Sequence, residues 1–76
     1  MNNARRKSIC KIADALNELK SQIDELYEEE QGAFENIPES LHGTKRYEIA
    51  ENAVDMLESA SLRVENAITF LEDAEG

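Results

Sequence analysis

The segment that decides the fold is residues 50–74, AENAVDMLESASLRVENAITFLEDA, in which one short pattern recurs every seven residues. The repeats begin at Ala50, Leu57, Val64 and Leu71, and each has glutamate second and alanine fourth. A seven-residue apolar repeat of this length is typical of a helix that packs lengthwise against other helices. We therefore predict a helix over about residues 45–74, with an alanine seam on one side and glutamates on the other.

A second helix is predicted upstream, over about residues 4–34. Its apolar residues alternate spacings of three and four, as the a and d positions of a coiled coil require: Ile9, Ile12, Leu16, Leu19, Ile23 and Leu26. Asn2 or Asn3 can cap its start. Gly32 lies near its far end and could mark the stop, because glycine weakens a helix interior.

The connection between the helices is a turn over about residues 36–43. Pro38 disfavours helix at the residue before it, Gly43 can adopt a left-handed conformation, and Thr44 can cap the helix that follows. Since so short a connection favours antiparallel neighbours, the predicted fold is all-α, a single domain over residues 1–76 that forms an antiparallel, coiled-coil-like two-helix hairpin.

The apolar face of the second helix is wider than one neighbouring helix can cover. We expect its central seam to consist of Ala50, Ala53, Leu57, Ala60, Val64, Ala67, Leu71 and Ala74. Tyr47, Val54 and Ile68 flank this seam on one side, and Ile49, Met56 and Phe70 flank it on the other. One flank is left for a second copy of the chain, which predicts a homodimer forming a four-helix bundle. The expected dimer interface is Ile49, Met56, Leu57, Val64, Phe70 and Leu71.

Composition restricts the classes of partner. The chain has 76 residues with 17 acids, 8 bases and a net charge of −9, which disfavours nucleic acid and anionic membranes as direct partners. No apolar run reaches the 18 residues of a membrane span, and the segment after the basic start is interrupted by charges, so we expect a soluble, cytoplasmic protein. The single cysteine, Cys10, fits a reducing compartment or the absence of any redox constraint.

Charge is also unevenly distributed along the chain. Residues 1–20 have five bases and two acids, whereas residues 21–76 have three bases and fifteen acids. An antiparallel hairpin would place the basic start of the first helix, Arg5 to Lys11, alongside the acidic end of the second, Glu65 to Glu75. We expect this attraction to favour the antiparallel orientation, although each exposed pair contributes only about 0–1 kcal/mol.

No motif in the sequence predicts an enzyme, a cofactor or a metal site. Glu39 and His42 have the Glu-x-x-His spacing of a carboxylate-bridged metal helix, but there is one copy and it falls in the turn. Cys10 lies beside Lys7 and Lys11 near a helix start, where its thiolate could be favoured. His42 is at the opposite end of the first helix, so the two cannot form a catalytic couple within one chain.

The candidate binding surface is acidic. It consists of Glu28, Glu29, Glu30, Glu48, Glu51, Asp55, Glu58, Glu65 and Glu72. One interpretation is a solvated exterior that keeps a small protein in solution. The other is a surface for a basic partner, because solvated helices usually intersperse lysine with glutamate, and after Arg46 the second helix has only Arg63. A dimer would carry twice −9, a charge of the same order as duplex DNA of similar length, with about one charge per 1.7 Å.

The segment from Ala33 to Glu48, AFENIPESLHGTKRYE, lies between an Arg-Arg-Lys start and an alanine-glutamate helix. In this the chain resembles small helical-hairpin proteins carried by phages and conjugative elements of Gram-positive bacteria. The resemblance implies a genomic setting and not a biochemical activity. Small acidic proteins of such elements often bind host proteins, and they include DNA-mimic inhibitors of restriction and CRISPR nucleases.

Two functional hypotheses follow. In the first, the protein is a non-enzymatic, anti-CRISPR-like inhibitor that occupies a basic, nucleic-acid-binding surface of a host or defence protein. In the second, it is a structural or assembly module whose acidic face only confers solubility. Salt distinguishes them, because mimicry of nucleic acid should weaken steeply with ionic strength and assembly through apolar seams should not.

Overall fold

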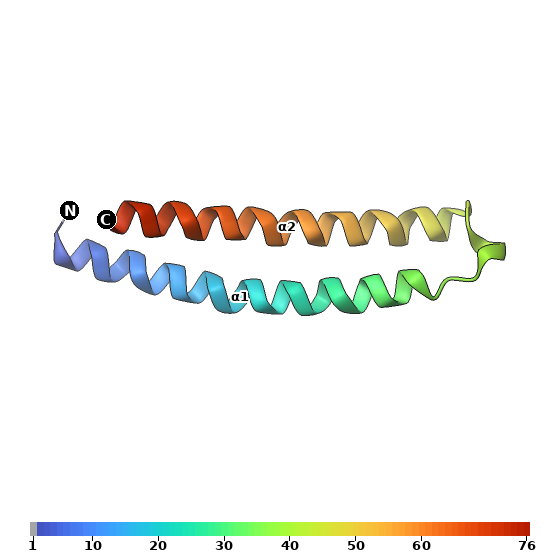
Figure 1. Ribbon diagram of the computed structural model, residues 1–76, viewed down its shortest axis with the longest axis horizontal. Coiled ribbons are helices and arrows are strands. Elements are labelled where there is room, and N and C mark those ends of the chain that lie inside the picture. The colour runs from blue at the N-terminus through green and yellow to red at the C-terminus, as the bar shows by residue number, and fades with distance from the viewer. Residues whose placement is uncertain (1) are drawn as a thin grey trace.

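The protein folds into two long antiparallel helices joined by a short turn (Figure 1). The computed structural model describes residues 2–76. Helix α1 spans Asn3–Glu35, the short 3-10 helix η1 spans Glu39–Leu41, and α2 spans Lys45–Glu75. Both long helices begin and end within one residue of their expected positions, and the all-α helical hairpin is confirmed.

Side-chain caps explain where the helices begin. The backbone N–H of Arg5 donates to the side-chain oxygen of Asn2 at 2.8 Å, and the N–H of Tyr47 donates to the hydroxyl of Thr44 at 3.3 Å. Each cap satisfies a donor that has no partner within its helix. Gly43 has φ +85°, the left-handed conformation expected of it before α2. Gly32 does not end α1, which continues to Glu35.

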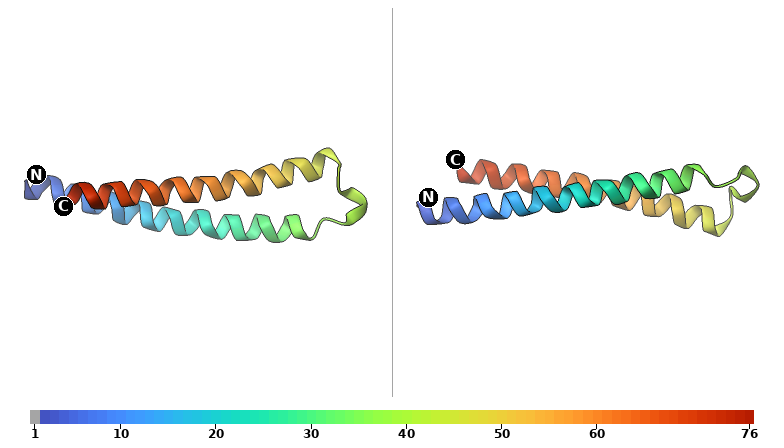
Figure 2. Two further views of the ribbon diagram at one scale, coloured as in Figure 1. Left: turned by 45° about the horizontal axis from the view of Figure 1, so that its top comes forward. Right: turned by 90° about the horizontal axis from the view of Figure 1, so that it is seen from below.

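The hairpin is a narrow rod with a thin core. Its principal extents are 59 × 15 × 13 Å and its radius of gyration is 17.3 Å, against about 11 Å for a compact domain of this length. The two helices cross as they wind around each other, as the heptad repeat requires (Figure 2). Among the described residues, no side chain is fully buried. The hairpin therefore has two long faces open to solvent.

The seam between α1 and α2 differs from the expected one in half of its positions. On α1 it consists of Ile9, Ala13, Leu16, Lys20, Ile23, Tyr27, Glu30 and Phe34, all buried or half-buried. On α2 it consists of Tyr47, Ala50, Val54, Leu57, Ser61, Val64, Ile68 and Leu71. The prediction for Ile12, Leu19 and Leu26 was wrong within the hairpin, since each is 50 to 53% exposed. The alanine seam was also wrong, because Ala60, Ala67 and Ala74 are exposed and Ala53 is only half-buried.

Side-chain size favours this seam on α2, although on α1 the seam takes Ala13 and Lys20 in place of Ile12 and Leu19. Packing Val54 and Ile68 inward removes more apolar surface from water than packing the alanines would, and the area buried sets the free energy gained. These two residues, expected on a flank, are 9% and 6% exposed and form the core together with Ala13. A hairpin has only two helices, so the other apolar positions of each helix remain uncovered.

Candidate interaction surfaces

Apart from Leu41 of the turn and Leu62, the large apolar residues left exposed by the seam gather on one long side of the hairpin, which we call the open apolar face. On both helices they come one position before a seam residue, as Leu19 precedes Lys20 and Ala60 precedes Ser61. In an antiparallel pair, positions offset in the same sense from the seam lie on the same side. The open apolar face therefore combines Ile12, Leu19 and Leu26 of α1 with Ala53, Ala60, Ala67, Ala74, Ile49, Met56 and Phe70 of α2.

The exposure of these side chains is unusually high for their size. Phe70 is 73% exposed, Ile49 63% and Met56 55%. A soluble monomer rarely leaves so many large apolar residues together on one surface. The expected dimer-interface residues thus fall into two groups, since Ile49, Met56 and Phe70 are on the open apolar face, whereas the structure half-buries Leu57, Val64 and Leu71 in the hairpin seam.

The opposite side of the hairpin is acidic. The residue after each half-buried seam position of α2 is a glutamate, and every one of these glutamates is exposed. The acidic face consists of Glu48, Glu51, Asp55, Glu58, Glu65 and Glu72 of α2, with Asp14, Asp24, Glu28 and Glu35 of α1 beside them. The pKa of Tyr27 on α1 supports this placement. Burial raises this pKa, and so do the nearby carboxylates of Glu58, Asp55 and Glu35.

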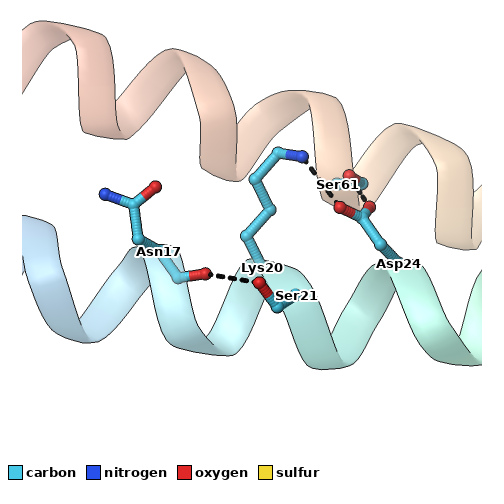
Figure 3. A network of polar contacts seen from close by, with 5 residues as sticks. All are labelled: Asn17, Lys20, Ser21, Asp24 and Ser61. Atoms are coloured by element: carbon cyan, nitrogen blue, oxygen red, sulfur yellow. Dashed lines mark hydrogen bonds and ion pairs between the residues drawn. The ribbon is translucent and has the colours of Figure 1, made fainter.

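A polar cluster joins the two helices on the acidic side near mid-length (Figure 3). The hydroxyl of Ser61 donates to one carboxylate oxygen of Asp24, and the Lys20 ammonium lies 2.9 Å from the other. These two hydrogen bonds, first from Ser61 and then from Lys20, hold the pKa of Asp24 below its ordinary value. Sequence reasoning did not find this cluster, although a lysine and a serine in a seam that is otherwise mostly apolar were a signal for it.

The acidic residues at the turn end do not form a single patch. Glu28, Glu29 and Glu30 are consecutive, so successive side chains point about 100° apart around α1. Glu28 falls on the acidic face, Glu29 on the side of the open apolar face, and Glu30 is half-buried in the seam. The candidate surface is therefore the long acidic face rather than a cluster at the turn.

Aromatic residues close the turn end of the hairpin. The ring of Tyr47 is 4.9 Å from that of Phe34 and 4.5 Å from that of His42, measured between centroids. The Nε2 atom of His42 is 3.1 Å from the carbonyl oxygen of Ile37. Of the two aliphatic residues of this turn, Ile37 is half-buried and Leu41 is exposed. His42 thus contacts Tyr47 and Ile37 at the turn end of the hairpin.

The possibility that the thiolate of Cys10 is favoured finds no support in the structure. The carboxylates of Asp14 and then Glu75 raise the pKa of the exposed Cys10 thiol, so the nearby lysines do not favour its thiolate. Across the described residues there is no cluster of three or more potential metal ligands and no pocket. No helix over residues 2–76 is long and apolar enough to cross a membrane.

The basic start of α1 lies alongside the acidic end of α2, as expected, but their side chains do not pair directly. Glu75 is close enough to Cys10 to affect its pKa, which places the two ends together. Within residues 2–76, the one ion pair is that of Lys20 with Asp24, and it lies inside α1. The attraction between the helix ends therefore acts at longer range and is weakened by salt.

Comparisons with protein-family models, with curated proteins and with solved structures gave no match to this chain.

Proposed function

We propose that the protein is a non-enzymatic binding protein whose acidic face occupies a basic, normally nucleic-acid-binding surface of another protein. The observation that carries the proposal is the separation of the two long sides, one acidic and one apolar. A face that holds most of the carboxylates of α2 in one line produces a directional field, and such fields steer a basic partner to the surface.

The proposal includes a homodimer that forms a four-helix bundle. Duplex DNA as long as the 59 Å hairpin carries about 35 charges, at one per 1.7 Å. A monomer with a net charge of −9 reaches about a quarter of that value, and a dimer reaches about half. The dimer is thus the better substitute for nucleic acid. A second copy packed on the open apolar face would also explain why that face is apolar.

The proposed setting is the cytoplasm of a bacterial host, with a phage or mobile element as the source of the protein. This part of the proposal draws on the resemblance of residues 33–48 to small hairpin proteins of such elements. It makes the basic partner a host or defence protein, for example a nuclease that binds DNA or guide RNA. The proposed action is competition with that nucleic acid, without a cofactor or a metal.

A second candidate function is assembly, and the open apolar face favours it. If the helical bundle is itself the purpose of the protein, the acidic face only keeps the assembly dissolved. The two functions differ in their response to salt. Binding by the acidic face should weaken as ionic strength rises, whereas apolar assembly should be nearly insensitive to it.

Capture of the partner followed by displacement tests the leading proposal. The immobilised protein is incubated with a lysate of the bacterial host, and the bound proteins are then challenged with duplex DNA. We expect a retained basic protein that duplex DNA displaces and that salt elutes. Retained proteins that resist both DNA and salt would contradict mimicry and favour assembly. Two variants with equal net charge, one neutralised on the acidic face and one elsewhere, identify the face that is responsible.

A further inference from the structure

We infer that the open apolar face is where a second copy of this chain packs, with the two hairpins running in opposite directions. The turn of one hairpin then lies beside the chain ends of the other. The inference rests on the proposed dimer and adds its surface and its orientation. Four independent features of the hairpin support it.

The first feature is the amount of surface left uncovered. The hairpin exposes 5758 Å², whereas a compact monomer of 8.6 kDa exposes about 4,700 Å². The excess is about 1,000 Å² per chain. A stable interface of standard size buries about 800 Å² on each partner. The surplus surface is therefore enough for one such interface, and the apolar part of it is concentrated on the open apolar face.

The second feature is the near absence of charge along this face. In a chain with one charged residue in three, α2 contributes only Arg63 to the face between Ile49 and Ala74. On α1 the charges of this face lie at its ends, with Arg5 near the start and Glu29 near the turn. A basic partner would not be drawn to so neutral a surface, whereas burial against a second apolar face suits it.

The third feature is the symmetry of the apolar positions. Ile12 and Leu26 lie one heptad to either side of Leu19, and the alanines of α2 are centred between Ala60 and Ala67. Asp24 contacts Ser61 across the hairpin, which fixes the relative level of the two helices. At that level, Leu19 and the midpoint of the α2 alanines lie less than one helical turn, or 5.4 Å, apart along the rod. A single two-fold axis perpendicular to the rod therefore suits this row of α1 and the alanine row of α2 at once.

The fourth feature is the charge at the two ends of the hairpin. Residues 21–64, which form the turn half, have three bases and eleven acids, a net of −8, while the remaining residues have a net of −1. If the hairpins packed with their turns together, the turn half of one copy, with a net charge of −8, would lie beside the equally charged turn half of the other. Opposite directions place the acidic half of one copy beside the nearly neutral half of the other, and Glu29 of one near the partner's Arg5. Like-charge repulsion thus selects the opposite orientation.

A distance between labels measures the orientation directly. A spin label at Ser40→Cys in a Cys10→Ser background places one probe on each exposed turn. If the hairpins run in opposite directions, pulsed electron resonance should give a separation near the 59 Å length of the rod. A separation within about twice the 15 Å width would place the turns together and overturn the orientation, while leaving the dimer itself intact.

Matched substitutions test the surface. Leu19 is on the open apolar face and is 50% exposed, and Leu62 is on the acidic side and is 53% exposed. Sedimentation equilibrium should show that Leu19→Glu reduces the mass from twice 8.6 kDa to 8.6 kDa, while Leu62→Glu does not. A dimer that survives Leu19→Glu, or that Leu62→Glu also dissociates, would overturn the choice of face.

A conservative variant covers the case in which Leu19→Glu unfolds the chain. In the Cys10→Ser background, Leu19→Cys places a thiol near the proposed axis, where it should form a disulfide with the same residue of the partner on mild oxidation. Leu62→Cys should remain unlinked. Efficient linking of Leu62→Cys and none of Leu19→Cys would contradict the inference. A wild-type protein that is monomeric at all concentrations would refute both this inference and the proposed dimer, but not binding by the acidic face.

Discussion

At the scale of single residues, Asp24 is the side chain that links the two helices through polar contacts. It receives a hydrogen bond from Ser61 of α2 and pairs with Lys20 of its own helix. Ser61 is 9% exposed, so its hydroxyl needs a partner, and the carboxylate supplies one. The cluster also fixes the level of α1 against α2, because apolar contacts alone tolerate sliding by a heptad.

The pKa of Asp24 gives a prediction for acid conditions. Because the folded-state pKa is lowered, the stabilisation by this carboxylate is fully present above its ordinary pKa of 3.8 and is lost as the pH falls through the lower, folded value. Asp24→Asn should therefore reduce the free energy of unfolding at pH 7. The difference from wild type should shrink progressively below about pH 3.8, as measured by urea unfolding at a series of pH values.

The exposed Asp14 is a matched control for this experiment. Asp14→Asn removes the same charge from the same helix without breaking a contact to α2, so its effect should be small. If Asp24→Asn and Asp14→Asn changed stability equally across the pH range, the contact with Ser61 would have no energetic role.

At the scale of elements, the sequence determined the helices well and the seam only in part. Asn2, Pro38, Gly43 and Thr44 act locally, through caps and fixed backbone angles, so their positions predicted the ends of α1 and α2. The seam is not a local property. Two apolar stripes on each helix share positions such as Leu16 and Leu57, and periodicity does not say which stripe faces which neighbour.

The candidate surfaces could be predicted to a similar extent. The glutamates that follow the half-buried seam residues of α2 were assigned correctly to an exposed surface, because every plausible seam leaves them outside. The position of Leu19 and its neighbours could not be predicted, since it depends on the relative size of Val54, Ile68 and the alanines. The contact of Asp24 with Ser61 was missed because a search for apolar periodicity ignores polar seam residues.

The two internal glycines give a matched prediction about the elements. Alanine at Gly32 or at Gly43 would meet no atom within 4 Å, so only backbone conformation distinguishes the two sites. Gly32→Ala should raise the free energy of unfolding by about 0.5–1 kcal/mol, because alanine favours a helix interior. Gly43→Ala should lower it by about 1–2 kcal/mol, because φ +85° is strained for alanine.

Thermal and urea unfolding of both variants at one protein concentration measure these changes. Holding the concentration fixed matters, because dimerisation would couple stability to concentration. A stabilising Gly43→Ala substitution would mean that the turn does not need its left-handed residue. A destabilising Gly32→Ala substitution would mean that α1 is not regular near its end.

At the scale of the whole molecule, the hairpin separates two kinds of surface. One long side is apolar and nearly uncharged, and the other is lined with carboxylates. A second copy on the open apolar face would leave both acidic faces exposed on the outside of the bundle. We therefore propose assembly through one side of the hairpin and binding through the other, and a substitution on one side should leave the function of the other unchanged.

Two variants with the same net charge test whether the acidic face itself binds. The first neutralises Glu51, Glu58, Glu65 and Glu72 on the acidic face, each by glutamine. The control neutralises four exposed acids elsewhere, by Glu18→Gln, Glu25→Gln, Glu39→Gln and Asp73→Asn. Each variant loses four negative charges, so they differ only in where the charge is removed. Neither alters a seam residue, and both should remain helical by circular dichroism.

The association rate of these two variants with the captured basic protein is the most direct test of the account. At physiological salt, the acidic-face variant should associate about tenfold or more slowly than wild type, because steering depends on the face that meets the partner. The control variant should retain a rate close to that of wild type. Equal slowing of both variants would show that net charge alone matters, and unchanged rates for both would show that the acidic face is only a solvated exterior; either result would contradict binding by this face.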